Sequence, residues 1–320
     1  MKKVLIAVLA LAAVACNKAE IVEQAPANAI TFESVFVDNA TKSVYDPSFN
    51  NTKMFSDFTL YGFVEGATLF NGTTVNKTIV NSELTSDWKY EGTQYWIADA
   101  KYNFSAVAPE TDGNWTYKSA TKEGTSLSFV NDGKHDVLYA QTETITGQST
   151  GNTKVGFTFR HILSKVKFTF ENTYNANNTE LQVHEIKINN AYANADVDLT
   201  AATTTWSAWA NNNLVLDFGN AATTAADAMQ AFGYNTAIES YNELLLIPAD
   251  YTSNKLNISF KYDIVVNGTV VRTFEMNPQV VVNLLPGHSY DFKATITPGE
   301  PIEFTVTSIT DWTNENETAM

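Results

Sequence analysis

Cysteine is nearly absent from this sequence of 320 residues: the only one is Cys16, close to the N-terminus. Without a second cysteine the chain can form no internal disulfide, and the residues after Cys16 offer no thiolate for a metal or for catalysis. Charged residues are also few, at 17%, and the formal net charge is −15. Proteins that bind nucleic acid present a basic face, so this charge argues against nucleic acid as a partner.

The sequence motifs of common enzyme classes are missing as well. No G-x-S-x-G, P-loop or dinucleotide-binding glycine pattern occurs. None of the four histidines has a second ligand at the spacing of a metal site, and Asp196-Val197-Asp198 lacks the further oxygen ligands and the glycine of a calcium loop. The sequence therefore predicts no enzyme, no cofactor and no metal. We interpret His161, His184 and Lys165 as structural residues.

Long apolar runs are absent after the N-terminus. The one such run, Val4 to Ala15, follows Lys2-Lys3 and ends at Cys16. A basic start and about a dozen apolar residues are typical of a secretory signal, and the run is shorter than the ~20 residues of a transmembrane helix. Residues 1–15 are therefore predicted to be a signal peptide.

Ala13-Val14-Ala15-Cys16 resembles a bacterial lipobox. By that resemblance Cys16 becomes the lipidated first residue of the mature chain, held at the outer membrane by a tether of residues 16–28. An ordinary signal peptide with an incidental cysteine is the alternative.

The sequence is rich in threonine, asparagine and aromatic residues, arranged in short alternating runs. Threonine and aromatics favour half-buried strands, asparagine favours turns, and many such runs predict an all-β chain of β-sandwiches. Asn267-Gly268, between two alternating runs, predicts a hairpin. Asn71-Gly72 predicts another turn, and the alanine-rich segment Ala221 to Phe232 is the only predicted helix.

The stretch Val155 to Glu171 contains a change of phase. Its apolar residues first occupy the odd positions 155, 157 and 159 and then the even positions 166, 168 and 170. Because side chains alternate strictly along a strand, such a change marks a break, a bulge or a move between sheets. We interpret His161 to Ser164 as the junction between an N-terminal β-sandwich at residues 29–162 and a C-terminal β-sandwich at residues 163–320.

Two early segments, Ala29 to Val37 and Phe55 to Val64, carry apolar residues on both faces. Strands of this kind are covered on both sides.

Tryptophans form the remaining candidate site. Trp206 and Trp209, in a polar stretch that we interpret as a loop, are candidates for stacking against a glycan. Packing in the core or at its rim is the alternative.

Several motifs together resemble one protein family. VGFTFRHILSKVKFTF, residues 155–170, resembles the F-x-H-x-L-S-K-V segment of the fimbrillin (Mfa-like) family, which is related to the type V pilins. Other motifs follow in the family's order: Ile30-Thr31-Phe32, Trp88 with Tyr95-Trp96, Tyr102 to Pro109, Asp136 to Ala140 and Asp311-Trp312. The resemblance implies two tandem transthyretin-like β-sandwich (Greek-key) domains, lipoprotein export and a surface or fimbrial role without enzyme activity.

The family also implies a mechanism of assembly. A trypsin-like protease cuts such a precursor after its first strand, and a strand from a neighbouring subunit fills the groove that remains. The matching removable strand is residues 30–37, and its apolar residues are Ile30, Phe32, Val35 and Val37.

The matching cut falls between Lys42 and Ser43, which departs from the family's cut after arginine. The only arginines, Arg160 and Arg272, lie within strand patterns. Two alternatives follow. Either a protease accepts lysine here, or the chain is not processed and acts as an anchor, a minor subunit or a stand-alone surface lipoprotein.

The leading hypothesis is a lipid-anchored surface protein that acts as a fimbrial subunit or adhesion component. Its partners are other fimbrial subunits, joined by strand addition, and a host or bacterial surface ligand. The second hypothesis is a stand-alone glycan-binding lipoprotein. The third is an exported hydrolase, because paired carboxylates can converge from distant strands.

Overall fold

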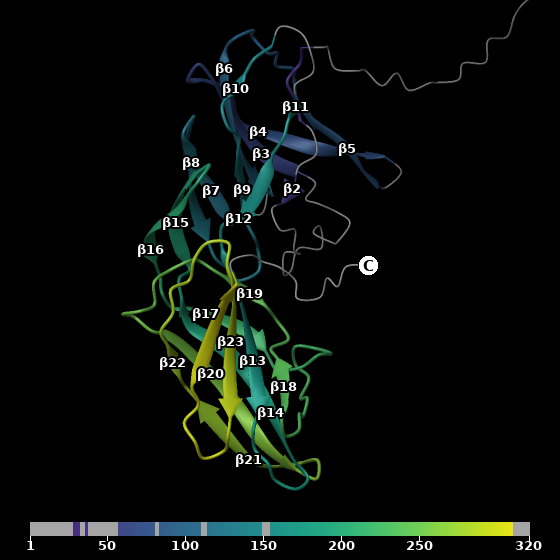
Figure 1. The fold of residues 1–320 in the computed structure, drawn as a ribbon, viewed down its shortest axis with the longest axis vertical. Helices are drawn as coiled ribbons and strands as arrows, with labels where there is room; N and C mark the ends of the chain where they lie inside the picture. Colours follow the sequence, from purple (N-terminus) through teal and green to yellow (C-terminus); the bar gives the residue numbers. More distant parts are fainter. Residues whose placement is uncertain are drawn as a thin grey trace, which may run out of the picture.

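The chain folds into β-sheets throughout the part that the computed structural model describes, residues 28–32, 36–37, 57–80, 83–109, 114–148 and 154–309. None of these residues lies in a helix, which confirms the all-β prediction. No segment among them is a helix that could cross a bilayer. The molecule is elongated, with one group of sheets towards each end (Figure 1).

A ten-stranded sheet forms most of the first lobe. Along the sheet the order is β11 (Lys154–Val155), β1 (Thr31–Phe32), β5 (Glu83–Tyr90), β4 (Ala67–Val80), β3 (Asp57–Val64), β6 (Lys101–Ala108), β9 (Leu138–Gln141), β12 (Thr158–His161) and β2 (Phe36–Val37), and β10 (Ile145–Thr146) pairs with β6. At one end of this order β1 pairs with β11, and at the other end β2 pairs with β12. Because β1 and β2 both lie within residues 31–37, and β11 and β12 both lie within residues 154–161, the two ends of the sheet meet and the sheet closes on itself.

A four-stranded sheet covers the ten-stranded one and completes the first lobe. Its order is β16 (Thr204–Ala210), β15 (Asn194–Thr200), β8 (Gly124–Val130) and β7 (Trp115–Thr121). The β15–β16 hairpin comes from the second half of the sequence, yet β15 pairs with β8 over seven residue positions, from Asn194 to Thr200.

Two five-stranded sheets form the second lobe. One has the order β18 (Thr236–Glu239), β13 (Ser164–Asn172), β23 (Ser289–Ile296) and β24 (Phe304–Ile309), with β19 (Leu244–Leu246) on β13. The other has the order β17 (Leu214–Gly219), β14 (Thr179–Ala191), β20 (Leu256–Val266) and β21 (Thr269–Met276), with β22 (Gln279–Val280) on β20. Their facing side chains enclose one apolar core.

The change of phase in residues 155–171 separates three cores. Positions 155, 157 and 159 face the inside of the ten-stranded sheet. Ile162 and Leu163, between β12 and β13, lie in the core shared with the four-stranded sheet. Positions 166, 168 and 170 lie in the core of the second lobe. The predicted break is therefore confirmed.

Strand β3 is covered on both faces, as its composition predicted. Phe58 and Leu60 lie in the inner core of the ten-stranded sheet, whereas Tyr61 and Phe63 contact the four-stranded sheet.

The two Asn-Gly pairs have different structures. Asn267 and Gly268 have φ angles of 48° and 76° and join β20 to β21, so this predicted hairpin is confirmed. Asn71-Gly72 was predicted as a turn, and this is wrong. Strand β4 continues through it with a shift in its register against β3, and the positive φ of Gly72, 73°, fits a bulge.

The helix predicted at residues 221–232 is also wrong. The segment pairs instead with neighbouring strands: the Ala221 N–H donates to Val183 O, and the Ala222 N–H donates to Glu239 O. Phe232 exchanges two backbone bonds with Leu181. Tertiary pairing outweighs the helix propensity of alanine here.

The domain limits 29–162 and 163–320 stay a prediction. Arg160, on β12, binds the turn of the β15–β16 hairpin: its guanidinium donates to the carbonyl oxygens of Thr200 at 2.6 Å, Thr203 at 2.8 Å and Ala201 at 3.1 Å. The β15–β16 hairpin, residues 194–210, thus packs with the first lobe, although the predicted limits assign it to the second domain.

Candidate functional site

The segment predicted to be the first strand contributes β1 and β2, and residues 28–30 before β1 are held by the loop after β5. The Ile30 N–H donates to Gln94 O at 2.8 Å, and the Trp96 N–H donates to Asn28 O at 2.9 Å. The Tyr90 hydroxyl donates to Ile30 O at 3.0 Å. Burial raises the pKa of the Tyr90 phenol, so this hydroxyl stays a neutral donor.

The opposite edge of the first strand pairs with residues 154–159 in parallel. Thr31 and Phe32 are opposite Lys154 and Val155, and β2 is opposite the start of β12. Phe32 also pairs with Trp88 of β5. Strand β1 is therefore an interior strand of the sheet, bonded on both sides.

Phe32 fills the centre of an aromatic cluster in the inner core. Its ring centroid lies 5.9 Å from those of Phe58 and Tyr90 and 6.0 Å from that of Phe157. Phe32 is only 2% exposed, and Ile30 is equally buried. Ile30 and Phe32 are thus part of the core that the rest of the sheet encloses.

Several sequence-predicted residues lie outside the described part of the chain. These are Cys16, Val35, Lys42 and Ser43. Of Val37 the structure describes the backbone alone, opposite Phe159. Arg160 and Arg272 lie in β12 and β21, as their strand patterns predicted.

The histidines form pairwise contacts with nearby groups. His161 Nδ1 lies 2.5 Å from Asp136 Oδ2, and both side chains are buried. His184 Nε2 lies 3.3 Å from Asp263 Oδ2. Within the described residues, no three His, Cys, Asp or Glu side chains are grouped so that they could hold a metal ion.

Lys165 is a buried lysine just after the junction between the lobes. Its Nζ lies 3.4 Å from Glu243 Oε2. This ion pair and the contacts of His161 give both residues a structural role.

The two candidate glycan-stacking tryptophans do not form one platform. Both lie in strand β16, not in a loop. Trp206 is 6% exposed, packs against Phe129 and donates its Nε1–H to Ile162 O at 3.0 Å. Trp209 is 42% exposed and donates to Pro248 O. Trp206 is therefore a core residue, as the alternative of core packing expects.

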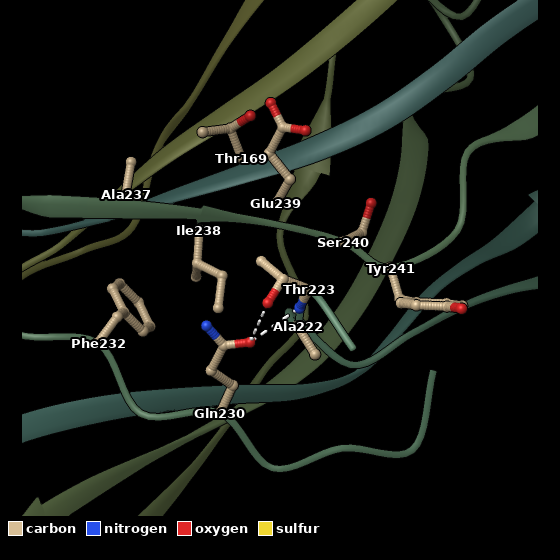
Figure 2. Close-up of a pocket in the computed structure, with 10 residues that line it drawn as sticks. All are labelled: Thr169, Ala222, Thr223, Gln230, Phe232, Ala237, Ile238, Glu239, Ser240 and Tyr241. Atoms are coloured by element: carbon tan, nitrogen blue, oxygen red, sulfur yellow. Dashed lines mark hydrogen bonds between the residues drawn. The ribbon is translucent and has the colours of Figure 1, made fainter. Parts of the chain in front are cut away.

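Sequence reasoning missed a hollow in the second lobe beside the edge strand β18, which has a volume of about 620 Å³. Its walls come from β18 and from the loop of residues 222–232 (Figure 2). The alanine-rich sequence of that loop pointed to a helix and so gave no signal of a site.

Comparison with known proteins gives a family and several solved structures of similar fold. No curated protein matches the chain. Among solved structures, a cell adhesion protein from Bacteroides uniformis is 16% identical, with a TM-score of 0.48 over 89% of this chain and 98% of that chain. The fimbrial anchor protein Mfa2 from Porphyromonas gingivalis is 9% identical, with a TM-score of 0.36 over 88% of this chain and 96% of that one. The model of the fimbrillin-like family matches residues 41–312, and the chain therefore belongs to the fimbrillin-like family.

Proposed function

We propose that the chain is a cell-surface fimbrial subunit or adhesion lipoprotein that assembles by strand exchange after loss of its first strand. The observation that carries this proposal is the position of β1 between β5 and β11, with Phe32 in the core. Membership of the fimbrillin-like family supports the surface and adhesion role.

Removal of the first strand would leave both unpaired polar groups and an open apolar core. The carbonyl of Gln94 and the hydroxyl of Tyr90 would lose their partners on Ile30. Phe58 and Phe157 would lose the ring that fills the space between them. Unpaired backbone groups and an open apolar core are both costly, and a strand from a neighbouring subunit satisfies them together.

The anchor and the processing site complete the proposal. Lipidated Cys16 holds the unprocessed chain at the outer membrane, and a cut between Lys42 and Ser43 separates the anchor and the first strand from the remainder. A chain that is not cut keeps its first strand and serves as an anchor, a minor subunit or a stand-alone surface lipoprotein.

Sequencing the N-terminus of the chain in surface filaments from its natural host type tests processing. We expect chains that begin at Ser43 and expect Lys42→Ala to abolish that terminus, because a trypsin-like protease needs the basic side chain. Lys53→Ala, at the nearest following lysine, is the control and should leave the terminus unchanged. Chains that begin only at lipidated Cys16, with no filaments, would contradict a polymerised subunit and leave the anchor role.

A further inference from the structure

The loop of residues 91–100, which we call the tip loop, lies at the end of the first lobe that is far from the second lobe. Strand β6 begins directly after this loop, at Lys101. The other end of β6, Ala108, pairs with Leu138, and Leu138 pairs with His161 at the junction between the lobes. Figure 1 shows β6 and β10 at the far end of the first lobe.

The tip loop presents two large apolar side chains to the surface. Tyr95 is 46% exposed and Ile97 is 61% exposed, the largest fraction for a large apolar residue in the part of the chain that the structure describes. Trp96, between them, is buried. Because side chains alternate along an extended segment, Tyr95 and Ile97 project to one side and form what we call the tip patch.

The tip patch is held in one conformation. The Ile97 N–H donates to the Tyr102 hydroxyl at 2.7 Å, and the Trp96 ring packs edge-on against the Tyr102 ring, with the centroids 4.7 Å apart. Gly147 packs so closely on the loop that a Cβ there would clash with the Ile97 carbonyl. The Gly147 N–H donates to Ala100 O at 2.8 Å. A surface that is already ordered loses little conformational entropy when a partner binds.

The tip loop also borders the start of the first strand. Tyr95 forms an antiparallel bridge with Ala29, and the backbone groups of Gln94 and Trp96 bond Ile30 and Asn28. Any strand that replaces the first strand therefore passes beside the tip patch.

The other end of the first strand offers no room for a neighbouring subunit. There β2 runs parallel to β12, and β12 ends at His161. Strand β13 of the second lobe begins three residues later, at Ser164. The second lobe of the same chain thus lies beyond this end, and a neighbour that donates a strand has to approach from the tip.

We propose that the tip patch docks the body of the subunit that donates the strand, and that this subunit is a second copy of the chain. Large side chains on a rigid surface are typical anchors of interfaces. An uncharged patch also suits two copies that each have a formal net charge of −15 and repel each other. The contact rests on the strand exchange proposed above. It joins the tip of one copy to a different surface of the next, which builds an open filament and not a closed dimer.

Assembly of the exported full chain tests the tip patch. A site-specific protease sequence is placed between residues 42 and 43, the chain is cut, and light scattering gives the concentration at which half of the chains are polymerised. We expect Tyr95→Ser and Ile97→Ser each to raise this concentration by about tenfold, because each removes one large apolar side chain from the contact. Tyr117→Ser and Val130→Ser are the controls, since these residues are 44% and 50% exposed and lie in the four-stranded sheet. Both should assemble like the unsubstituted chain.

Uptake of a fluorescent synthetic peptide of residues 29–37 measures the groove without a neighbouring subunit. We expect both tip variants to take up this peptide as the unsubstituted chain does, because the peptide brings no second body to dock. Unchanged assembly of both tip variants, an equal loss in the two controls, or impaired peptide uptake would each overturn the docking role. If the unsubstituted chain stays monomeric after the cut, strand exchange itself fails and the docking role fails with it, a result distinct from the other three.

Discussion

Replacing Phe32 by alanine is expected to lower the free energy of unfolding of the first lobe by about 3–5 kcal/mol, the usual cost of truncating a buried phenylalanine. Phe32 packs against Phe58, Tyr90 and Phe157, and β1 is bonded on both sides. The strand therefore cannot move inward to fill the cavity. Native-state hydrogen exchange of amides in β3 and β5 measures this lobe separately from the other.

Thr31→Ala is the control for Phe32→Ala. Thr31 lies next to Phe32 on the same strand, but its side chain is on the opposite face and only half-buried. We expect a loss below about 1 kcal/mol, as for most positions outside the core. A loss for Phe32→Ala as small as that for Thr31→Ala would mean that the first strand contributes little to the core, and its removal would then leave no apolar groove to fill.

Replacing His161 by alanine is expected to cost about 3 kcal/mol, because it removes a buried ring and leaves the buried Asp136 side chain without its hydrogen-bond partner. The Asp136 side chain is 1% exposed and lies 2.5 Å from His161 Nδ1. His135→Ala is the matched control, because His135 Nδ1 lies at the same distance from Asp132, with both side chains at the surface. An exposed pair contributes about 1 kcal/mol or less.

Urea unfolding of the two histidine variants gives the comparison directly. A small and equal loss for His161→Ala and His135→Ala would show that burial does not strengthen the junction pair. It would also remove the structural explanation for the histidine in the F-R-H-I-L-S-K-V segment.

The sequence predicted those parts of the fold that depend on local alternation. The phase change after position 159 located the junction, because a strand cannot present both parities to one core. Asn267-Gly268 located a hairpin for the same local reason, since both residues must adopt positive φ.

Local patterns failed where pairing partners were distant in sequence. Asn71-Gly72 has the composition of a turn, but strand β4 continues through it beside β3, and the pair forms a bulge. Ala221–Phe232 has the composition of a helix, but its backbone forms hydrogen bonds with residues distant in sequence, namely Val183, Leu181 and Glu239. The placement of the β15–β16 hairpin on β8 carries no local signal, because either lobe could have accepted it.

The candidate sites were predictable to different degrees. Of the segment 29–37, which is apolar on both faces, the structure describes the side chains of residues 29–32, and among these Ala29, Ile30 and Phe32 are buried. Nothing in the sequence linked Asp136 to His161, although both lie in family-like motifs. Trp206 and Trp209 looked equivalent in sequence, and only the structure separates a core ring from an exposed one.

Exchange of the first strand between subunits is tested most directly by a controlled cut. A site-specific protease sequence is placed between Lys42 and Ser43 of the exported chain, and mass is followed by size-exclusion light scattering before and after cleavage. We predict a monomer that becomes a polymer when cut, and a polymer that fails to form in excess synthetic peptide of residues 29–37. A cut chain that stays monomeric and keeps its N-terminal fragment bound would contradict the claim.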